Sequence, residues 1–315
     1  MRKVVSKLLK WIRGDPTRLF VDPPKPSADR SGLALVIIVR NEERHIEDWL
    51  RFHALAGARA AIVYDNGSTD ATAQIARDFQ GLEVTVVPWV TDIRLGQSPL
   101  KRQPLAYAHA VCTFGARFRW MGFIDIDEYI VPKTESGICE ALGKLEAISN
   151  ISLPWTMFGT DGHEAPPDEP AVYAYRSRAA QRRPDFTNFK CIVDPCKVIR
   201  VSTHKYWTSD MGASTVNDRG EPASNHKERR TEAFASAELL QLNHYFTFSQ
   251  EELDRKLSRE TVSHAAQSDR EKFVRKTVAA IEEDTVSDDC APEFLTRKGI
   301  EDWHEFRALG RPSSL

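Results

Sequence analysis

Short apolar runs that alternate with helical patterns constrain the fold of this chain more than any other feature. The run Leu33–Val39 is continuously apolar and rich in β-branched residues, which is typical of a central strand buried on both faces. A helix over 42–57, a strand over 60–64, a helix over about 71–79 and a strand over 84–88 are then expected. Strands and helices joined in this order form parallel sheets with right-handed crossovers. The sequence therefore predicts the α/β class, with a mostly parallel sheet flanked by helices.

The second half of the chain predicts further strands and a helical end. Strands are expected over 151–155, 172–176, 192–201 and 239–248. The polar stretch 208–232, rich in Asn, Asp, Gly and Arg, predicts a mobile loop. Ser249 and Glu252 have the spacing of a capping box and predict the start of a helix.

Four segments are expected along the chain. Residues 1–14 form a basic amphipathic helix, 15–31 a proline-rich linker, 32–250 the α/β domain and 251–315 a helical C-terminal extension. Within residues 1–13 the apolar and basic side chains fall on opposite arcs of a helix. Such a helix can lie in a membrane interface or pack on its own domain, and both alternatives stay open.

Composition excludes several classes of protein. The formal net charge of -2 and the absence of a basic block interleaved with aromatic residues argue against a nucleic-acid partner. No apolar run reaches about 18 residues, so no transmembrane span is expected, and no secretory signal is recognised. The expected location is cytoplasmic, with peripheral contact of residues 1–13 at the inner face of the plasma membrane as an open alternative.

One apolar run ends abruptly in acidic residues. Residues 120–124 predict a buried strand, and Asp125, Asp127 and Glu128 follow it directly. Because burial of an unpaired carboxylate is costly, we expect these acids just beyond the strand end, facing a cleft. Asp125 and Asp127 are two residues apart in an extended segment, so they point the same way and can share one hard cation. The alternative is that they only cap a turn.

Polar residues also follow the first two strands. Arg40, Asn41 and Glu42 follow the first, and Asp65 and Asn66 follow the second. Open α/β sheets bind ligands beyond the carboxyl ends of their strands, although Asn and Asp are also ordinary turn residues there. The joint occurrence of the three strand ends in this order is more specific than any one of them.

With these motifs the chain resembles glycosyltransferases of the GT-A fold, in particular family 2-like enzymes and the related family 92. The matching segments are 39–42, 64–70, 123–128 and 243–246, within a resemblance that covers roughly 33–259. The resemblance implies a GT-A, Rossmann-like fold and a nucleotide-sugar donor. It does not specify the sugar.

The resemblance also implies roles for individual residues. The implied donor-binding residues are Arg40, Asn41, Glu42, Asp65, Asn66, Asp125 and Lys190, and the implied ligands of Mn²⁺ or Mg²⁺ are Asp125, Asp127 and His244. Lys190 would meet the diphosphate as a point charge. His244 could equally be a packed, hydrogen-bonded histidine of its strand. His204 lies where the family tends to have a histidine near the cleft.

The segment 155–164 contains the candidate acceptor site. Trp155 and Phe158 could stack on a sugar ring. Asp161 or Glu164 could act as the base that takes the proton of the acceptor hydroxyl in an inverting transfer. Asp161 is favoured because the two glycines around it allow close approach, and the alternative is a turn in which Asp161 bonds its own backbone.

The leading hypothesis is a metal-dependent, inverting hexosyltransferase. It would move a sugar from a UDP-sugar to a glycan or lipid-linked acceptor in cell-surface polysaccharide synthesis. A phosphatase with a nucleophilic aspartate also places two aspartates after a strand, but it usually has a small hydroxyl residue where this chain has Tyr129. A non-catalytic component that binds nucleotide-sugars is the third hypothesis, although it would have little need of intact carboxylates.

Overall fold

The computed structural model describes residues 19–90, 92–95, 98–183, 188–225, 227–258 and 264–309. The predicted N-terminal helix over 1–14 therefore lies outside the described residues. No helix within the described ranges is long and apolar enough to cross a bilayer.

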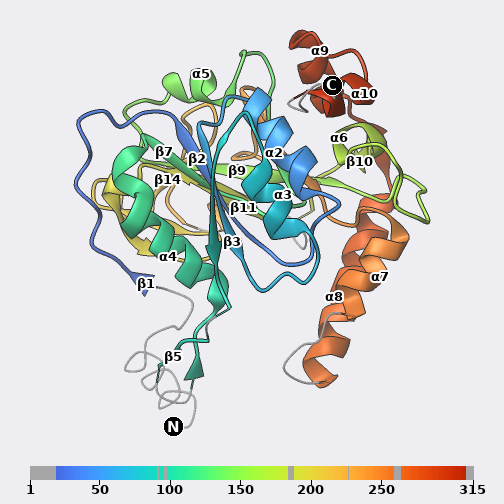
Figure 1. Ribbon diagram of the computed structural model, residues 1–315, viewed down its shortest axis with the longest axis horizontal. Helices are drawn as coiled ribbons and strands as arrows, with labels where there is room; N and C mark the ends of the chain where they lie inside the picture. The colour runs from blue at the N-terminus through green and yellow to red at the C-terminus, as the bar shows by residue number, and fades with distance from the viewer. Residues whose placement is uncertain are drawn as a thin grey trace.

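Four parallel strands form one half of the main sheet (Figure 1). They lie in the order β7 (Trp120–Phe123), β2 (Leu33–Val39), β3 (Ala60–Asp65) and β4 (Glu83–Pro88). All seven residues of β2 are apolar, four on one face and three on the other, as a strand buried on both faces requires. The strands predicted from residues 33 to 124 are thus confirmed.

The other half of the sheet is built on one long strand, β9 (Asn150–Phe158). Its first half pairs antiparallel with β11 (Phe189–Val193), which also pairs antiparallel with β7. Its second half, from Trp155 onward, pairs parallel with β16 (Leu240–Tyr245). Strand β16 in turn pairs antiparallel with β8 (Glu128–Pro132). The sheet therefore branches at Trp155: β9 pairs with β11 up to Pro154 and with β16 from Trp155 onward.

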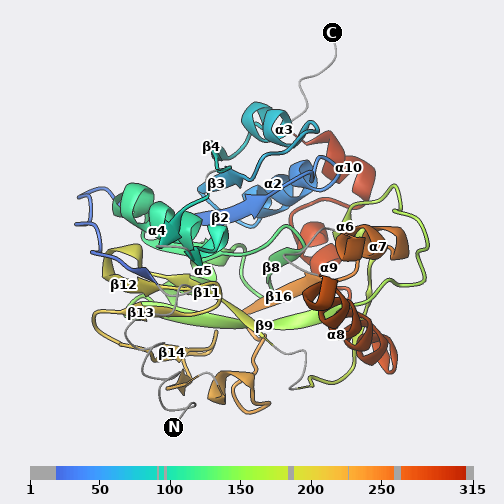
Figure 2. The same ribbon diagram turned by 90° about the horizontal axis from the view of Figure 1, so that it is seen from below.

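Helices cover both faces of this sheet (Figure 2). Along β2, Leu33, Leu35 and Ile37 pack with α2 (Ile46–Leu55), while Ala34 and Val36 pack with α4 (Arg102–Phe114). Helices α3 (Thr72–Asp78) and α5 (Ile138–Gly143) lie with α2, whereas strands β12 (Val198–Val201) and β13 (Tyr206–Thr208) lie with α4. The predicted α/β class is confirmed, and the two expected helices over 42–57 and 71–79 form with shorter bounds.

Three local predictions are wrong. Residues 172–176 are not a strand, because Pro170 caps α6 (Ala171–Ala174) and its carbonyl accepts from Tyr173 N and Ala174 N. The expected strand 192–201 is interrupted by a 3₁₀ turn at Pro195–Lys197, where Asp194 caps the turn through Cys196 N. The expected loop 208–232 contains the short strands β14 (Thr215–Val216) and β15 (Pro222–Ala223).

The predicted loop 208–232 is also anchored to the body of the protein. Asn217 and Asp218 are fully buried within it. Asp218 Oδ2 accepts hydrogen bonds from the backbone nitrogens of Leu239 and Leu240, at the start of β16.

The C-terminal part is largely helical. It comprises α7 (Gln250–Ser258), α8 (His264–Glu282), β17 (Thr285–Ser287), α9 (Cys290–Arg297) and α10 (Trp303–Ala308). Strand β17 pairs with β10 (Ser177–Ala179). The capping box of α7 is confirmed: Ser249 Oγ donates to Glu252 Oε2 at 2.7 Å, and Glu252 N donates to Ser249 Oγ at 3.3 Å.

Candidate active site

The acidic segment lies at the junction of the two halves of the sheet. It connects the end of β7, which pairs with β2 and β11, to the start of β8, which pairs with β16. Tyr245 N, at the end of β16, donates to Asp127 O at 2.8 Å and fixes the segment against that strand. Side chains from β11 and β16 converge on residues 125–128, through Lys190 and His244.

Asp125 is held by donors from two elements. Gln103 Nε2, in the first turn of α4, donates to Oδ1 at 2.8 Å, and Lys190 Nζ, from β11, donates to Oδ2 at 2.7 Å. Lys190 is 1% exposed. Burial alone would lower the pKa of its ammonium, but Asp125 and Glu128 outweigh burial and hold that pKa above its usual value. Lys190 is therefore a buried cation that neutralises the acidic segment.

Asp127, Glu128 and His244 form the one cluster of potential metal ligands found among the described residues. Each presents one ligand atom, and the three atoms lie within 4.8 Å of one another. Burial would raise the pKa of Asp127, but the nearby Lys256 and His244 outweigh it and hold the pKa well below the usual range. Burial raises the pKa of Glu128, and Lys190 only partly offsets this effect.

This cluster fits a divalent cation. Glu128 Oε1 and His244 Nδ1 are buried and lack a hydrogen-bond partner among the described residues. Buried polar atoms are normally satisfied, so each of these two atoms has capacity for a further partner. The other imidazole nitrogen, His244 Nε2, lies 3.5 Å from Asp127 Oδ2. Carboxylate oxygens with an imidazole nitrogen are a donor set that suits Mn²⁺ and, less well, Mg²⁺. Asp125, which the sequence predicted as a ligand, instead bonds Lys190 and lies outside this set.

The loops beyond β2 and β3 are joined to each other. Asn41 N donates to Ser68 Oγ at 3.0 Å, and Thr69 N donates to Asn41 Oδ1 at 2.8 Å. Asn41 has a φ of 56°, a left-handed conformation that asparagine tolerates better than most residues. Asn41 therefore fixes the two loops together, while Arg40 at the same turn is exposed.

The second loop is also tied to the acidic segment through the start of α4. Asp65 Oδ1 accepts from Ser68 N at 2.9 Å, and Asn66 Oδ1 accepts from Arg102 Nη1 at 2.5 Å. Arg102 is followed directly by Gln103, which bonds Asp125. The three strand ends that the sequence singled out are thus brought together at one edge of the sheet. Glu42 contributes a backbone hydrogen bond at this edge, from its N to Thr72 Oγ1.

Aromatic rings border the cluster of Asp127, Glu128 and His244 on one side. The Trp155 ring lies 4.4 Å from the His244 ring and 5.7 Å from the His204 ring, measured between centroids. Trp155 is half-buried, and its Nε1 has no hydrogen-bond partner among the described residues. Phe158 is fully buried and packs on Tyr245, 4.9 Å away, so it presents no face to a ligand.

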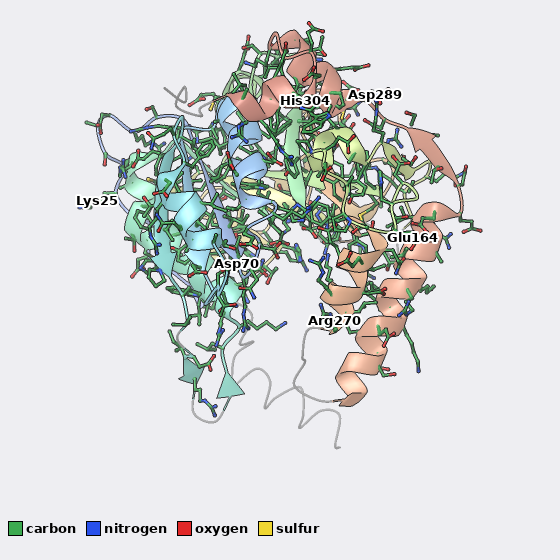
Figure 3. All side chains as sticks on the ribbon, turned by 45° about the vertical axis from the view of Figure 1, so that its right-hand side comes forward. Lys25, Asp70, Glu164, Arg270, Asp289 and His304 are labelled. Carbon is green, nitrogen blue, oxygen red and sulfur yellow. The ribbon has the colours of Figure 1, made fainter. Side chains whose placement is uncertain are left out.

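The loop after β9 meets the start of α7. Gln250 N donates to His163 O, and Glu251 N donates to Glu164 O. Asp161 has a φ of 51°, and its two carboxylate oxygens accept from Ser177 Oγ and Arg176 N. That is a structural role within the turn. Glu164 is exposed and lies on the side of α7, across from Asp70 on the side of the strand-end loops (Figure 3).

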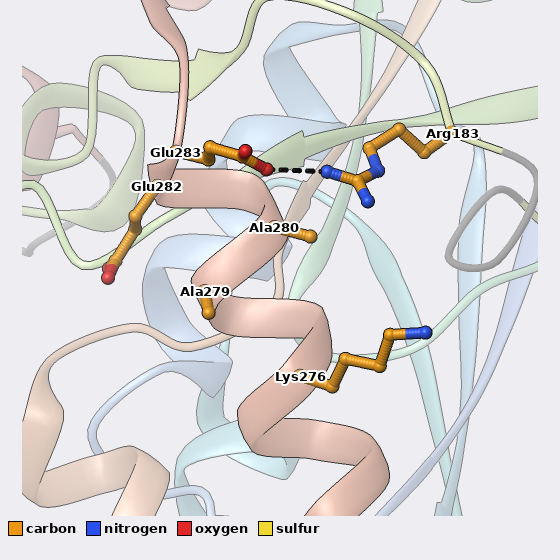
Figure 4. Close-up of a pocket in the computed structure, with 6 residues that line it drawn as sticks. All are labelled: Arg183, Lys276, Ala279, Ala280, Glu282 and Glu283. Carbon is orange, nitrogen blue, oxygen red and sulfur yellow. Dashed lines mark hydrogen bonds and ion pairs between the residues drawn. The ribbon is translucent and has the colours of Figure 1, made fainter.

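A surface hollow of about 590 Å³ lies beside α8 (Figure 4). It is lined by Arg183, Lys276, Ala279, Ala280, Glu282 and Glu283. Ala280 and its neighbour Ile281 pack towards Met157 and Trp155, so the hollow borders the aromatic side of the site. Arg183 and Glu283 form an ion pair across it.

The sequence prediction omits Gln103 and Lys256, and it gives no ligand role to Glu128 although it expects this acid beside the cleft. Glu128 carries a usable signal, because it continues the run of acids after the strand. Gln103 and Lys256 carry none, because a polar residue on an amphipathic helix is most often solvent-exposed, and only the packing of α4 and α7 brings these two to Asp125 and Asp127.

Comparison with solved structures finds glycosyltransferases at low similarity. One is the mannosyltransferase PcManGT from Pyrobaculum calidifontis in complex with GDP-Man and Mn²⁺, with 17% identity, a TM-score of 0.29, and coverage of 47% of this chain and 42% of that chain. Another is the glucosyl-3-phosphoglycerate synthase from Mycobacterium tuberculosis in complex with Mn²⁺, UDP and glucosyl-3-phosphoglycerate. It has 19% identity, a TM-score of 0.30, and coverage of 52% and 57%. These scores are too low to support an argument about function.

Two plant proteins are similar in sequence to part of this chain. A glycosyltransferase family 92 protein of Oryza sativa subsp. japonica is 23% identical over 155 residues, which are 47% of this chain and 25% of that protein. A family 92 protein of Ricinus communis is 22% identical over 154 residues, 46% of this chain and 26% of that protein. The chain thus spans about a quarter of the length of the curated relatives it matches. The model of glycosyltransferase family 92 matches residues 38–288, so the chain belongs to that family.

Proposed function

We propose that the chain is a metal-dependent glycosyltransferase that transfers a sugar from a UDP-sugar to a hydroxyl of a glycan or lipid-linked acceptor. One observation carries this proposal: the ligand atoms of the buried Asp127, Glu128 and His244 lie within 4.8 Å of one another at the carboxyl edge of the parallel strands. Ligands of open α/β sheets bind at that edge. Transfer with inversion, in cell-surface polysaccharide synthesis, is the form of the reaction that we favour.

In this proposal Asp127, Glu128 and His244 hold Mn²⁺ or Mg²⁺. The bound ion acts as a Lewis acid that stabilises negative charge on the leaving diphosphate. Lys190 keeps Asp125 oriented beside the cluster, which leaves Asp125 to contact the donor. Asp65 and the joined loops around Asn41 and Asn66 would form the wall against which the nucleoside lies.

The acceptor would lie on the side of Trp155, whose half-buried ring offers a face on which a sugar can stack. Inversion requires a base that takes the hydroxyl proton while the oxygen attacks the anomeric carbon opposite the diphosphate. Asp161 and Glu164 are the proposed bases. The hydrogen bonds that engage both oxygens of Asp161 now favour Glu164.

Isothermal titration calorimetry of UDP and UDP-sugars, with and without Mn²⁺, tests this function. The unaltered protein is expected to bind UDP more tightly when Mn²⁺ is present, and Asp127→Asn should lose more than about tenfold of that affinity. Glu128→Gln should behave similarly. Glu271→Gln, on the exposed side of α8, is the matched control.

Two results would contradict the proposal. One is UDP binding that is indifferent to Mn²⁺ in every variant. The other is hydrolysis of an aryl phosphate without affinity for any nucleotide-sugar, which would favour the phosphatase.

A further inference from the structure

A lysine from the C-terminal helices forms an ion pair with Asp127, one of the proposed metal ligands. Lys256 Nζ, on α7, lies 2.9 Å from Asp127 Oδ2. His244 Nε2 lies 3.5 Å from the same oxygen. The ammonium also donates to Phe246 O at 3.0 Å and lies 4.6 Å from the centre of the Phe246 ring. One oxygen of the carboxylate that would bind a metal is therefore bound to an internal cation.

This contact sets the ammonium and a divalent ion in competition. An ion held by Asp127 would lie on the same carboxylate as Lys256, and two positive charges a few ångströms apart repel strongly where water is scarce. Asp127 is 8% exposed, so little solvent screens it. A second buried ammonium, that of Lys190, lies 3.4 Å from Glu128 Oε2 and adds to the repulsion.

A bound diphosphate would relieve the repulsion between the Lys256 ammonium and the ion. It brings at least two negative charges to the ion, and its oxygens accept hydrogen bonds from an ammonium as well as a carboxylate does. With the diphosphate bound, Lys256 has an anionic partner in place of Asp127, and the conflict between the ammonium and the ion is removed.

We propose that Lys256 couples metal binding to nucleotide binding. Its ammonium pairs with Asp127 when both ligands are absent, disfavours the ion alone, and turns to the diphosphate when ion and nucleotide arrive together. This inference rests on the proposed function of the Asp127 cluster. By linkage the effect is reciprocal, so the nucleotide strengthens metal binding by the factor by which the metal strengthens nucleotide binding.

The exchange needs only a side-chain movement. Helix α7 is fixed by its capping box and by His45 Nε2, which lies 2.7 Å from Glu252 Oε1. The Lys256 side chain, by contrast, is 31% exposed and has four rotatable methylenes. The ammonium can therefore change partner while the helix backbone stays in place.

The test measures Mn²⁺ binding by electron paramagnetic resonance, without and with saturating UDP, in the full chain. Lys256→Met removes the charge and keeps the apolar stem on Phe246. We expect it to bind Mn²⁺ alone about tenfold more tightly than the unaltered protein, and the enhancement of Mn²⁺ binding by UDP to fall towards one. Lys256→Arg keeps the charge and should preserve most of the enhancement.

Arg255→Met is the matched control, because Arg255 is the neighbouring residue on α7, is 60% exposed and pairs with Glu251. Lys256→Gln serves as a second uncharged variant if the methionine variant does not fold. The inference is overturned if the uncharged variants bind Mn²⁺ alone no more tightly than the unaltered protein while UDP still enhances binding in all of them. If Mn²⁺ binds to none of the proteins even with UDP, the proposed function fails, and this inference fails with it.

Discussion

His53 on α2 shows how a single buried residue depends on its charge state. Its Nδ1 lies 2.9 Å from Trp49 O, and its Nε2 accepts from Ile130 N at 3.3 Å. Since a carbonyl can only accept and a backbone N–H can only donate, the ring must be the neutral tautomer with its proton on Nδ1. Burial lowers the pKa of His53 to about 3.

This pKa predicts a loss of stability in mild acid. In the unfolded chain His53 has its ordinary pKa of 6.5 and binds a proton below that pH. In the folded protein the pKa is about 3, so His53 stays neutral until the pH is much lower. Stability therefore falls as the pH drops between these values. From pH 7 to pH 5 the unfolding free energy should decrease by about 2 kcal/mol more than in His53→Gln. Urea denaturation at both pH values measures this difference, with His304→Gln, on the exposed face of α10, as control.

Equal changes in the unaltered protein and in His53→Gln would show that His53 is protonated in the folded state.

Among the secondary-structure elements, helix α7 has two structural roles: it contacts the strand-end loops and it positions Lys256. It closes on the strand-end loops through Glu252, which bonds both Ser249 at the cap and His45 before α2. It also carries Lys256 to the acidic segment. The stability of its first turn therefore decides whether Lys256 reaches Asp127.

Removal of the cap should be measurable. Ser249 is fully buried, and Ser249→Ala removes the acceptor of Glu252 N and one donor to the Glu252 carboxylate. We expect the unfolding free energy to decrease by about 1 kcal/mol. Ser258→Ala, at the exposed other end of α7, is the control in the same urea titration. An equal loss in both variants would contradict the capping role.

Elements differed in how well their sequences predicted them. The strand Leu33–Val39 and its parallel neighbours were predictable because continuous apolar runs match strands buried on both faces. The segment 172–176 was not, because its run of Val, Tyr, Ala and Tyr is as apolar and aromatic as a strand, while Pro170 starts a helical turn there. The residues of the candidate site differ in the same way. The position of Asp127 could be predicted, because it directly follows a strand. Lys256 is 129 residues away in sequence, and only tertiary packing brings it to Asp127.

At the scale of the whole molecule, the C-terminal helices share the core of the sheet. Phe294 and Leu295 of α9 and Phe306 of α10 are fully buried in the same apolar cluster as Phe52 of α2. Asp48 of α2 accepts from Arg307 of α10 at 2.7 Å and from Arg51 at 3.2 Å. The predicted boundary at residue 250 thus does not coincide with a gap in the core.

Loss of the ion pair to α10 should loosen this packing. Arg307→Met leaves the buried Asp48 with Arg51 but without its stronger partner, so we expect the unfolding free energy to fall by about 1–3 kcal/mol. Amide hydrogens of 303–308 should exchange faster than in the unaltered protein, as measured by mass spectrometry. Arg275→Met, an exposed residue of α8, is the control. Unchanged exchange over 303–308 would mean that apolar packing alone holds α10.

The branch of the sheet at Trp155 has a consequence for how such a protein can diversify. Strand β9 is locked in register on both sides, by β11 over its first half and by β16 over its second. An insertion inside it would disturb the pairing on both sides and the core at once. Between Phe158 and Ser177 the chain leaves and re-enters the sheet, and Ala171, Val172 and Tyr175 of that stretch are buried in the main core. Only the part before Pro170 is largely exposed, so changes there would leave the core unaltered. If the proposed acceptor site is right, new acceptor preferences would arise from changes in this exposed part of the chain.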